Sequence, residues 1–141
     1  MRLDLELAEQ MTRAACEAAA ADDCLVSAAV VDGGGHLVAF RRMDRAEFAG
    51  ATVAVDKAFT AAGNRIATLD LRDQVAPGGD LAGYHSAAGG RFIAFGGGVP
   101  LWYHGVVVGA VGVSGASGDQ DHAFASAGAA LWAEAGGALD G

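Results

Sequence analysis

Charge is scarce in this chain. Only 18% of its 141 residues are charged, against about 25% in an average soluble protein. The nine lysines and arginines form no basic stripe and are outnumbered by seventeen acidic residues, which excludes nucleic acid as a partner because duplex binding depends on neutralising phosphates. A surface with so little charge favours burial against further copies of the chain. We therefore expect a homo-oligomer of four or more chains.

Long apolar runs and cysteine pairs are also lacking. No uncharged apolar run approaches the ~20 residues that cross a membrane, so no membrane association is expected. The first nine residues carry acids where a signal peptide would carry an apolar core, which predicts a cytoplasmic location. The only cysteines, Cys16 and Cys24, form no CxxC pattern and are expected to be free thiols.

Apolar periodicity predicts a single domain over residues 1–141. The predicted helices cover 3–21, 46–66, a short piece from Thr68 to before Pro77, and 118–136. The predicted strands cover 25–31, 36–42, 92–95, 99–104 and 106–113, and 76–90 is a long loop. This order predicts an α/β fold in which helices cover a five-stranded, mainly antiparallel sheet.

The segment from Gly105 to His122 passes from an apolar run through glycines into a polar helix start. The β-branched run 106–113 is typical of a buried strand, and Ser117 with Gln120 fits a capping box that opens a helix. Backbone N–H groups from Ser114 to Gln120 would point outward at this junction. They could hold a carboxylate or another anion, although a plain strand–loop–helix joint explains the same pattern.

Several motifs together carry a family resemblance. They are Val30-Val-Asp32 followed by glycines, Asp56-Lys-Ala-Phe-Thr-Ala61, Phe95-Gly-Gly-Gly-Val-Pro-Leu101, and Gly105 to Gly115 followed by Asp119-Gln-Asp121. The chain resembles, over about residues 8–132, the haem-degrading or haem-binding domain family that includes the glycolate-operon protein G and the C-terminal domain of some cobalamin adenosyltransferases. The resemblance implies a profilin-like or PAS-like α/β/α layered domain that assembles into oligomers, with haem as a candidate cofactor.

Four histidines could serve a haem or a metal. His36 and His104 fall in glycine turns and are explained as exposed turn residues. His85, beside an aromatic ring in the glycine-rich loop, and His122, at the start of the last helix, are the stronger candidates. For each of them a purely structural role is the alternative.

Lys57 and Thr60 lie one turn apart on an alanine-rich helix, where a cation and a hydroxyl could receive a substrate carboxylate. Arg42 and Asp44 could add a second cation and a base. The alternative is a structural ion pair between Asp44 and either Lys57 or Arg42. We expect Lys57, Thr60 and the loop after Val113 to face one polar cavity, because both the lysine and the outward N–H groups need partners.

A metal site is not expected in the last helix, because Asp119 and His122 share a face while Asp121 is turned away from them. The candidate catalytic residues are Lys57, Asp44 and His122. The candidate ligand-binding residues are Arg42, Thr60, His85, Phe95, Gly97, Ser114, Gly115 and Asp119.

Two hypotheses for function follow. In the first, implied by the family resemblance, the chain binds haem or another tetrapyrrole or assists haem degradation, with His85 or His122 as an axial ligand. In the second, it is a cofactor-independent enzyme acting on a small organic acid or aromatic metabolite. Lys57 and Arg42 would then hold an anion, Asp44 or His122 would move a proton, and the 114–120 loop would stabilise an oxyanion.

Overall fold

A four-stranded antiparallel sheet lies at the centre of the computed structural model, which describes residues 2–141. The strand order is β2-β1-β4-β3. The strands are β1 (Ser27–Asp32), β2 (Leu37–Arg42), β3 (Gly98–Tyr103) and β4 (Val106–Ser114). The helices are α1 (Leu5–Ala21), α2 (Phe48–Asn64), α3 (Thr68–Val75) and α4 (Gly118–Glu134), and two 3₁₀ turns, η1 (Tyr84–Ser86) and η2 (Ala88–Gly90), follow α3.

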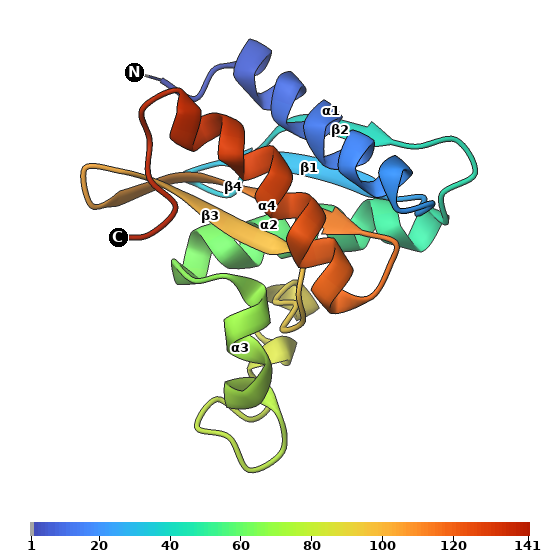
Figure 1. Cartoon of the computed structure of the whole chain (residues 1–141). Coiled ribbons are helices and arrows are strands. Elements are labelled where there is room, and N and C mark those ends of the chain that lie inside the picture. The colour runs from blue at the N-terminus through green and yellow to red at the C-terminus, as the bar shows by residue number, and fades with distance from the viewer. Residues whose placement is uncertain (1) are drawn as a thin grey trace.

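Helices cover both faces of the sheet, which makes three layers (Figure 1). Helices α1 and α4 lie together on one face and enclose the larger core, which includes Met11, Phe124 and Trp132. Helix α2 covers the other face through small residues. It approaches so closely that a Cβ at Gly112 of β4 would collide with the Ala54 carbonyl oxygen. Helix α3 and the segment after it project from the edge of these layers (Figure 1).

The sheet has four strands, so the prediction of five was wrong. Residues 92–95 are not a strand, although their apolar character favoured one. The Ile93 N–H donates to the Thr60 hydroxyl of α2, at 2.9 Å, and to no neighbouring strand. The Phe92 ring packs against Tyr84 and Phe59 with centroid separations of 4.8 and 5.8 Å. Aromatic packing under α2 therefore uses the apolar side chains that the sequence pattern assigned to a sheet.

The capping box was predicted correctly and fixes where α4 begins. The Ser117 hydroxyl accepts from the Gln120 N–H at 3.2 Å, and the Gln120 side chain accepts from the Ser117 N–H at 3.1 Å. These two bonds satisfy N–H groups that a helix start leaves without intrahelical partners. Among residues 2–141, no helix combines the length and the apolar character needed to cross a membrane.

Candidate functional site

The ammonium group of Lys57 is enclosed between α2, β4 and α4. The residue is 0% exposed, and its Nζ donates to the Val113 carbonyl at 2.9 Å and to Asp121 Oδ2 at 3.0 Å. The Asp121 side chain is equally enclosed. A buried charge is tolerated only when it is paired and hydrogen-bonded. The charge of each residue can therefore be buried only because the other residue pairs with it.

Asp121 also holds the loop between β4 and α4. Its carboxylate accepts from the N–H groups of Gly115 at 3.3 Å and Ala116 at 2.9 Å. Gly97 completes the enclosure, since it has a φ of +135° and a Cβ there would collide with the Val113 carbonyl oxygen and lie 2.8 Å from Lys57 Nζ. The loop N–H groups that could hold an anion thus already bind a carboxylate of the protein itself.

Burial lowers the pKa of Lys57 below its ordinary value of 10.5, although Asp121 opposes this by attraction and by its hydrogen bond. The Phe95 ring lies 4.9 Å from Lys57 Nζ and adds a cation–π contact. Phe95 is itself 49% exposed. Phe95 also lines a cavity beside α3.

The structure brings Lys57, Gly97, Ser114, Gly115 and Phe95 together, but it does not provide the expected common polar cavity. The carboxylate of Asp121 fills that place. Thr60 takes another role, since its hydroxyl donates to the Asp56 carbonyl at 2.7 Å while accepting from Ile93. Asp119 is exposed on the first turn of α4.

The alternative ion pairs were also wrong. Lys57 pairs with Asp121 and not with Asp44. Arg42 donates to the Ala46 carbonyl through Nε at 3.0 Å and Nη2 at 2.6 Å. Arg42 and Asp44 line a different cavity, beside α1.

His85 lies at a cavity of about 450 Å³, here called the side cavity, beside α3. It is lined by Arg72, Val75, Ala76, Pro77, His85, Gly90, Phe92, Ile93, Ala94 and Phe95. The His85 side chain forms no hydrogen bond or ion pair with any of residues 2–141 and is exposed. The Arg72 side chain is 60% exposed, and its one ion pair within residues 2–141 is with its neighbour Asp73, at 3.6 Å. The side cavity thus offers an apolar wall, an available imidazole and a reachable cation.

Helix α2 holds the far wall of the side cavity in place. The Tyr84 hydroxyl donates to Asn64 Oδ1 at 2.5 Å, and its ring packs on Phe92. Arg91 pairs with Asp56 at 2.8 Å and lies 3.7 Å from the centroid of the Phe59 ring. The segment 84–95 is therefore anchored at several points, although it contains little regular structure.

His122 lies apart from these residues. It lines a cavity of about 350 Å³ together with Trp102, Ser126 and Asp140. Its Nδ1 is buried and has no hydrogen-bond partner among the described residues. Within residues 2–141, no group of three His, Cys, Asp or Glu side chains could hold a metal ion.

Two residues of these sites were missed by the sequence reasoning. Asp121 was described as turned away, yet it occupies the inner face of α4, in line with the buried positions 124, 125, 128, 129 and 132. An acid on an apolar stripe was the available signal, because such an acid requires a buried cation. Arg72 gave no comparable signal, since an exposed arginine on a short helix is ordinary.

The layered α/β/α fold with an apolar side cavity defines a small domain suited to binding a small molecule. Residues 3–130 match the model of the family described as haem degrading protein HbpS-like. The chain belongs to this family.

Two curated proteins are similar to this chain in sequence. The corrinoid adenosyltransferase PduO of Salmonella typhimurium strain LT2 is 39% identical over 112 residues, which are 79% of this chain and 33% of that protein. This chain therefore spans about a third of the length of that enzyme. An uncharacterised 15.0 kDa protein of Citrobacter freundii is 37% identical over 123 residues, which are 87% of each chain.

A solved structure agrees over the whole length. The crystal structure of a PduOC–haem complex superimposes with a TM-score of 0.92 and 33% sequence identity, covering 100% of both chains. The α/β architecture of this chain is thus that of a domain crystallised with haem.

Proposed function

We propose that this chain binds haem or a related tetrapyrrole in the side cavity, where His85 would provide an axial ligand to the iron. The observation that carries the proposal is an imidazole without a protein partner at the edge of a mostly apolar cavity. Membership of the haem-degrading family and the haem complex of a structural relative support the same ligand.

The residues of the side cavity fit the chemistry of a tetrapyrrole. Val75, Phe92, Ile93 and Phe95 offer an apolar surface to a flat macrocycle. Arg72 would meet a propionate carboxylate, because its guanidinium is bound only to the neighbouring, exposed Asp73. Bound haem would supply the redox and ligand-binding chemistry of its iron.

The contacts of Lys57 disfavour the enzyme hypothesis. Its ammonium binds Asp121 and the Val113 carbonyl, and Asp121 also accepts from the N–H groups of Gly115 and Ala116. The donors expected to hold a substrate carboxylate or an oxyanion are thus engaged by the protein itself. Removing either charge would leave the other buried without a partner, which affects folding before it affects chemistry.

Hemin titration followed in the visible spectrum tests the haem proposal. We expect a sharp, saturable Soret band at near-stoichiometric hemin. His85→Ala should shift the band and weaken binding by about tenfold or more, because it removes the iron ligand. The matched control is His104→Ala, which removes an exposed turn histidine outside the side cavity.

Two results would contradict this assignment. A broad absorbance that neither substitution changes would indicate non-specific adsorption. A shift of the Soret band in His122→Ala, with no shift in His85→Ala, would instead assign the haem site to the cavity beside Trp102.

We also propose that the protein is a homo-oligomer of four or more chains. Leu37 and Phe40 of the edge strand β2 are 53% and 40% exposed, and Phe48 at the start of α2 is 80% exposed. Large apolar side chains gathered at an open sheet edge favour association. Light scattering at micromolar concentration should therefore give a mass of at least four times 14.0 kDa. The charged variant Phe48→Asp should lower that mass, and a monomer in the unmodified protein would reject the proposal.

A further inference from the structure

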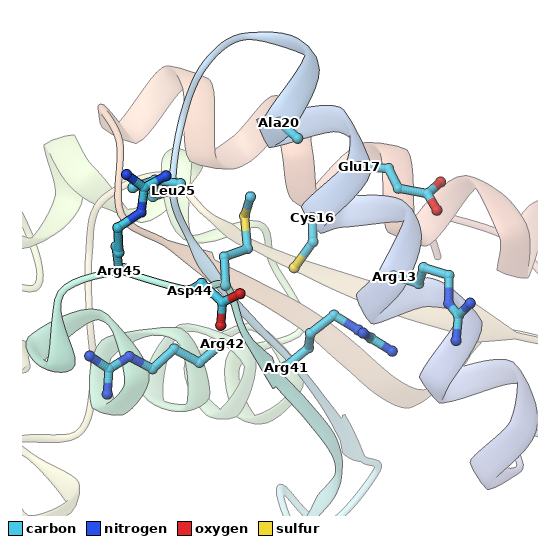
Figure 2. A pocket seen from close by; sticks show the side chains of 10 residues that line it. Arg13, Cys16, Glu17, Ala20, Leu25, Arg41, Arg42, Asp44 and Arg45 are labelled. Carbon is cyan, nitrogen blue, oxygen red and sulfur yellow. The ribbon is translucent and has the colours of Figure 1, made fainter.

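A second, chemically different cavity lies between α1 and the end of β2 (Figure 2). This cavity, of about 630 Å³, is here called the arginine cavity because Arg13, Arg41, Arg42 and Arg45 line it. It shares no lining residue with the side cavity. Four of the nine basic residues of a chain with a net charge of −8 thus line one cavity.

The positive charge there is not neutralised by the protein. None of the four guanidinium groups forms an ion pair with a carboxylate of residues 2–141. Two acids, Glu17 and Asp44, also line the cavity, so the cations outnumber the acids by two to one. Like charges held together without counterions repel one another, and an anion bound among them would relieve that repulsion.

Arg41 gives the most specific signal. Its Nε is buried and has no hydrogen-bond acceptor among the described residues. A buried donor of a charged group that makes no hydrogen bond is costly, and a guanidinium fork matches the two oxygens of a carboxylate or phosphate. Figure 2 shows the Arg41 side chain extending toward the side where Arg13 lies, while Arg42 extends the other way.

The uncharged residues of the cavity are apolar, and the strand end holds one of them, Met43, in place. Met43 accepts the Val26 N–H on its sulfur at 3.3 Å and donates its own N–H to the Val26 carbonyl at 3.0 Å. Leu25 and Cys16 add apolar surface. Burial raises the pKa of the Cys16 thiol, while the charge of Arg41 opposes this shift. The thiol therefore stays neutral beside the guanidinium and adds no competing negative charge.

We propose that the arginine cavity binds a small organic dianion, one that carries two carboxylates or a phosphate on a compact carbon body. Arg41 and Arg13 would hold the anionic groups, and Leu25 and Met43 would contact the carbon body. The site does not depend on the haem proposal, because the two cavities have no residue in common.

Calorimetric titration of the unmodified protein at constant ionic strength tests this site with three probes, namely succinate, inorganic phosphate and acetate. Saturable binding of succinate or phosphate, with acetate about tenfold or more weaker, is the expected result, because a monoanion engages fewer guanidinium groups. Binding of succinate alone would identify a dicarboxylate site, and binding of phosphate alone a phosphoryl site. Equal binding of acetate, or no saturable binding of either dianion, would overturn the proposal.

Variants then locate the binding. Arg13→Gln/Arg41→Gln should weaken dianion binding by about tenfold or more, and Arg41→Lys should also weaken it because it keeps the charge but loses the fork. Arg2→Gln/Arg65→Gln, which removes the same two positive charges at exposed positions outside the cavity, should leave binding unchanged. If the double variant does not fold, Arg13→Gln alone, at an exposed position of α1, replaces it. Undiminished dianion binding in a folded variant would reject the site.

Hemin serves as the cross-check on the same variants. Hemin binding should be unaffected by Arg13→Gln/Arg41→Gln and weakened in His85→Ala, and dianion binding should be weakened by the arginine variant and unaffected by His85→Ala. Loss of hemin binding in the arginine variant would assign the cavity to the propionates of haem and overturn the dianion proposal.

Discussion

Lys57 and Arg41 are both cationic side chains that the fold places against its central sheet, but the protein treats their charges differently. Lys57 is 0% exposed and bonds to Asp121 and to the Val113 carbonyl. Arg41 lies at the rim of a cavity, beside three other arginines, with its buried Nε bonded to nothing in the described chain. One cation is neutralised inside the protein, and the other is left available.

This contrast separates two uses of charge. The partner of Lys57 is part of the protein, so the pair can fix how α2, β4 and α4 meet and is expected to act on stability. The arginine cavity has no partner of its own for its excess positive charge, so its free energy depends on what binds from solution. Substitutions in the first region should therefore change the free energy of unfolding, and those in the second should change affinity.

The largest effect is expected from Asp121→Ala. It leaves the Lys57 ammonium buried without its carboxylate and removes the acceptor for the Gly115 and Ala116 N–H groups. Breaking a buried pair in this way costs about 3–5 kcal/mol. Urea unfolding followed by circular dichroism measures the loss.

The control lies two residues earlier. Asp119→Ala removes an exposed acid from the same first turn of α4 and should cost at most about 1 kcal/mol, through the helix dipole alone. Equal losses in the two variants would show that the Lys57–Asp121 pair has no special role in stability.

The Lys57–Asp121 pair and the arginine cavity differ in how far the sequence predicts them. The buried pair could have been found from the sequence, because Lys57 lies among Ala54, Ala58 and Ala61 on the buried stripe of α2 and Asp121 begins the buried stripe of α4. Two opposite charges on apolar stripes imply each other. Lys57 and Asp121 are 64 positions apart, so a comparison of Asp121 with residues of its own helix alone does not reveal the pair.

Local patterns predicted the helices and the capping box, because the bonds that define them join neighbouring residues. The fifth strand failed because an apolar run of four residues does not specify whether it pairs in a sheet or packs its rings on a helix. The arginine cavity could not be anticipated, since it needs α1 and the end of β2 to lie side by side. Only the tertiary arrangement provides that.

The pH dependence of the free energy of unfolding tests the Lys57–Asp121 pair further. Burial lowers the pKa of Lys57 below 10.5 in the folded chain. Between that lowered pKa and 10.5 the unfolded chain binds more protons at this position, so the contribution of Lys57 to the free energy of unfolding rises with pH. We expect the unmodified protein to gain stability, relative to Lys57→Met/Asp121→Asn, as the pH rises toward 10.5. A relative loss over this range would mean that attraction by Asp121 outweighs burial.

The smallest effect is expected from Arg41→Gln measured without a multivalent anion. The substitution removes a buried donor that has no acceptor and breaks no ion pair with residues 2–141. The free energy of unfolding should therefore fall by no more than about 0.5 kcal/mol. Adding succinate should then separate the two proteins. A ligand that binds only the folded state stabilises it by about 2.7 kcal/mol at a hundred times its dissociation constant, and Arg41→Gln should lose most of that gain at the same concentration. A large loss of stability in plain buffer would instead mean that Arg41, like Lys57, holds the fold together, and the contrast between the two regions would not stand.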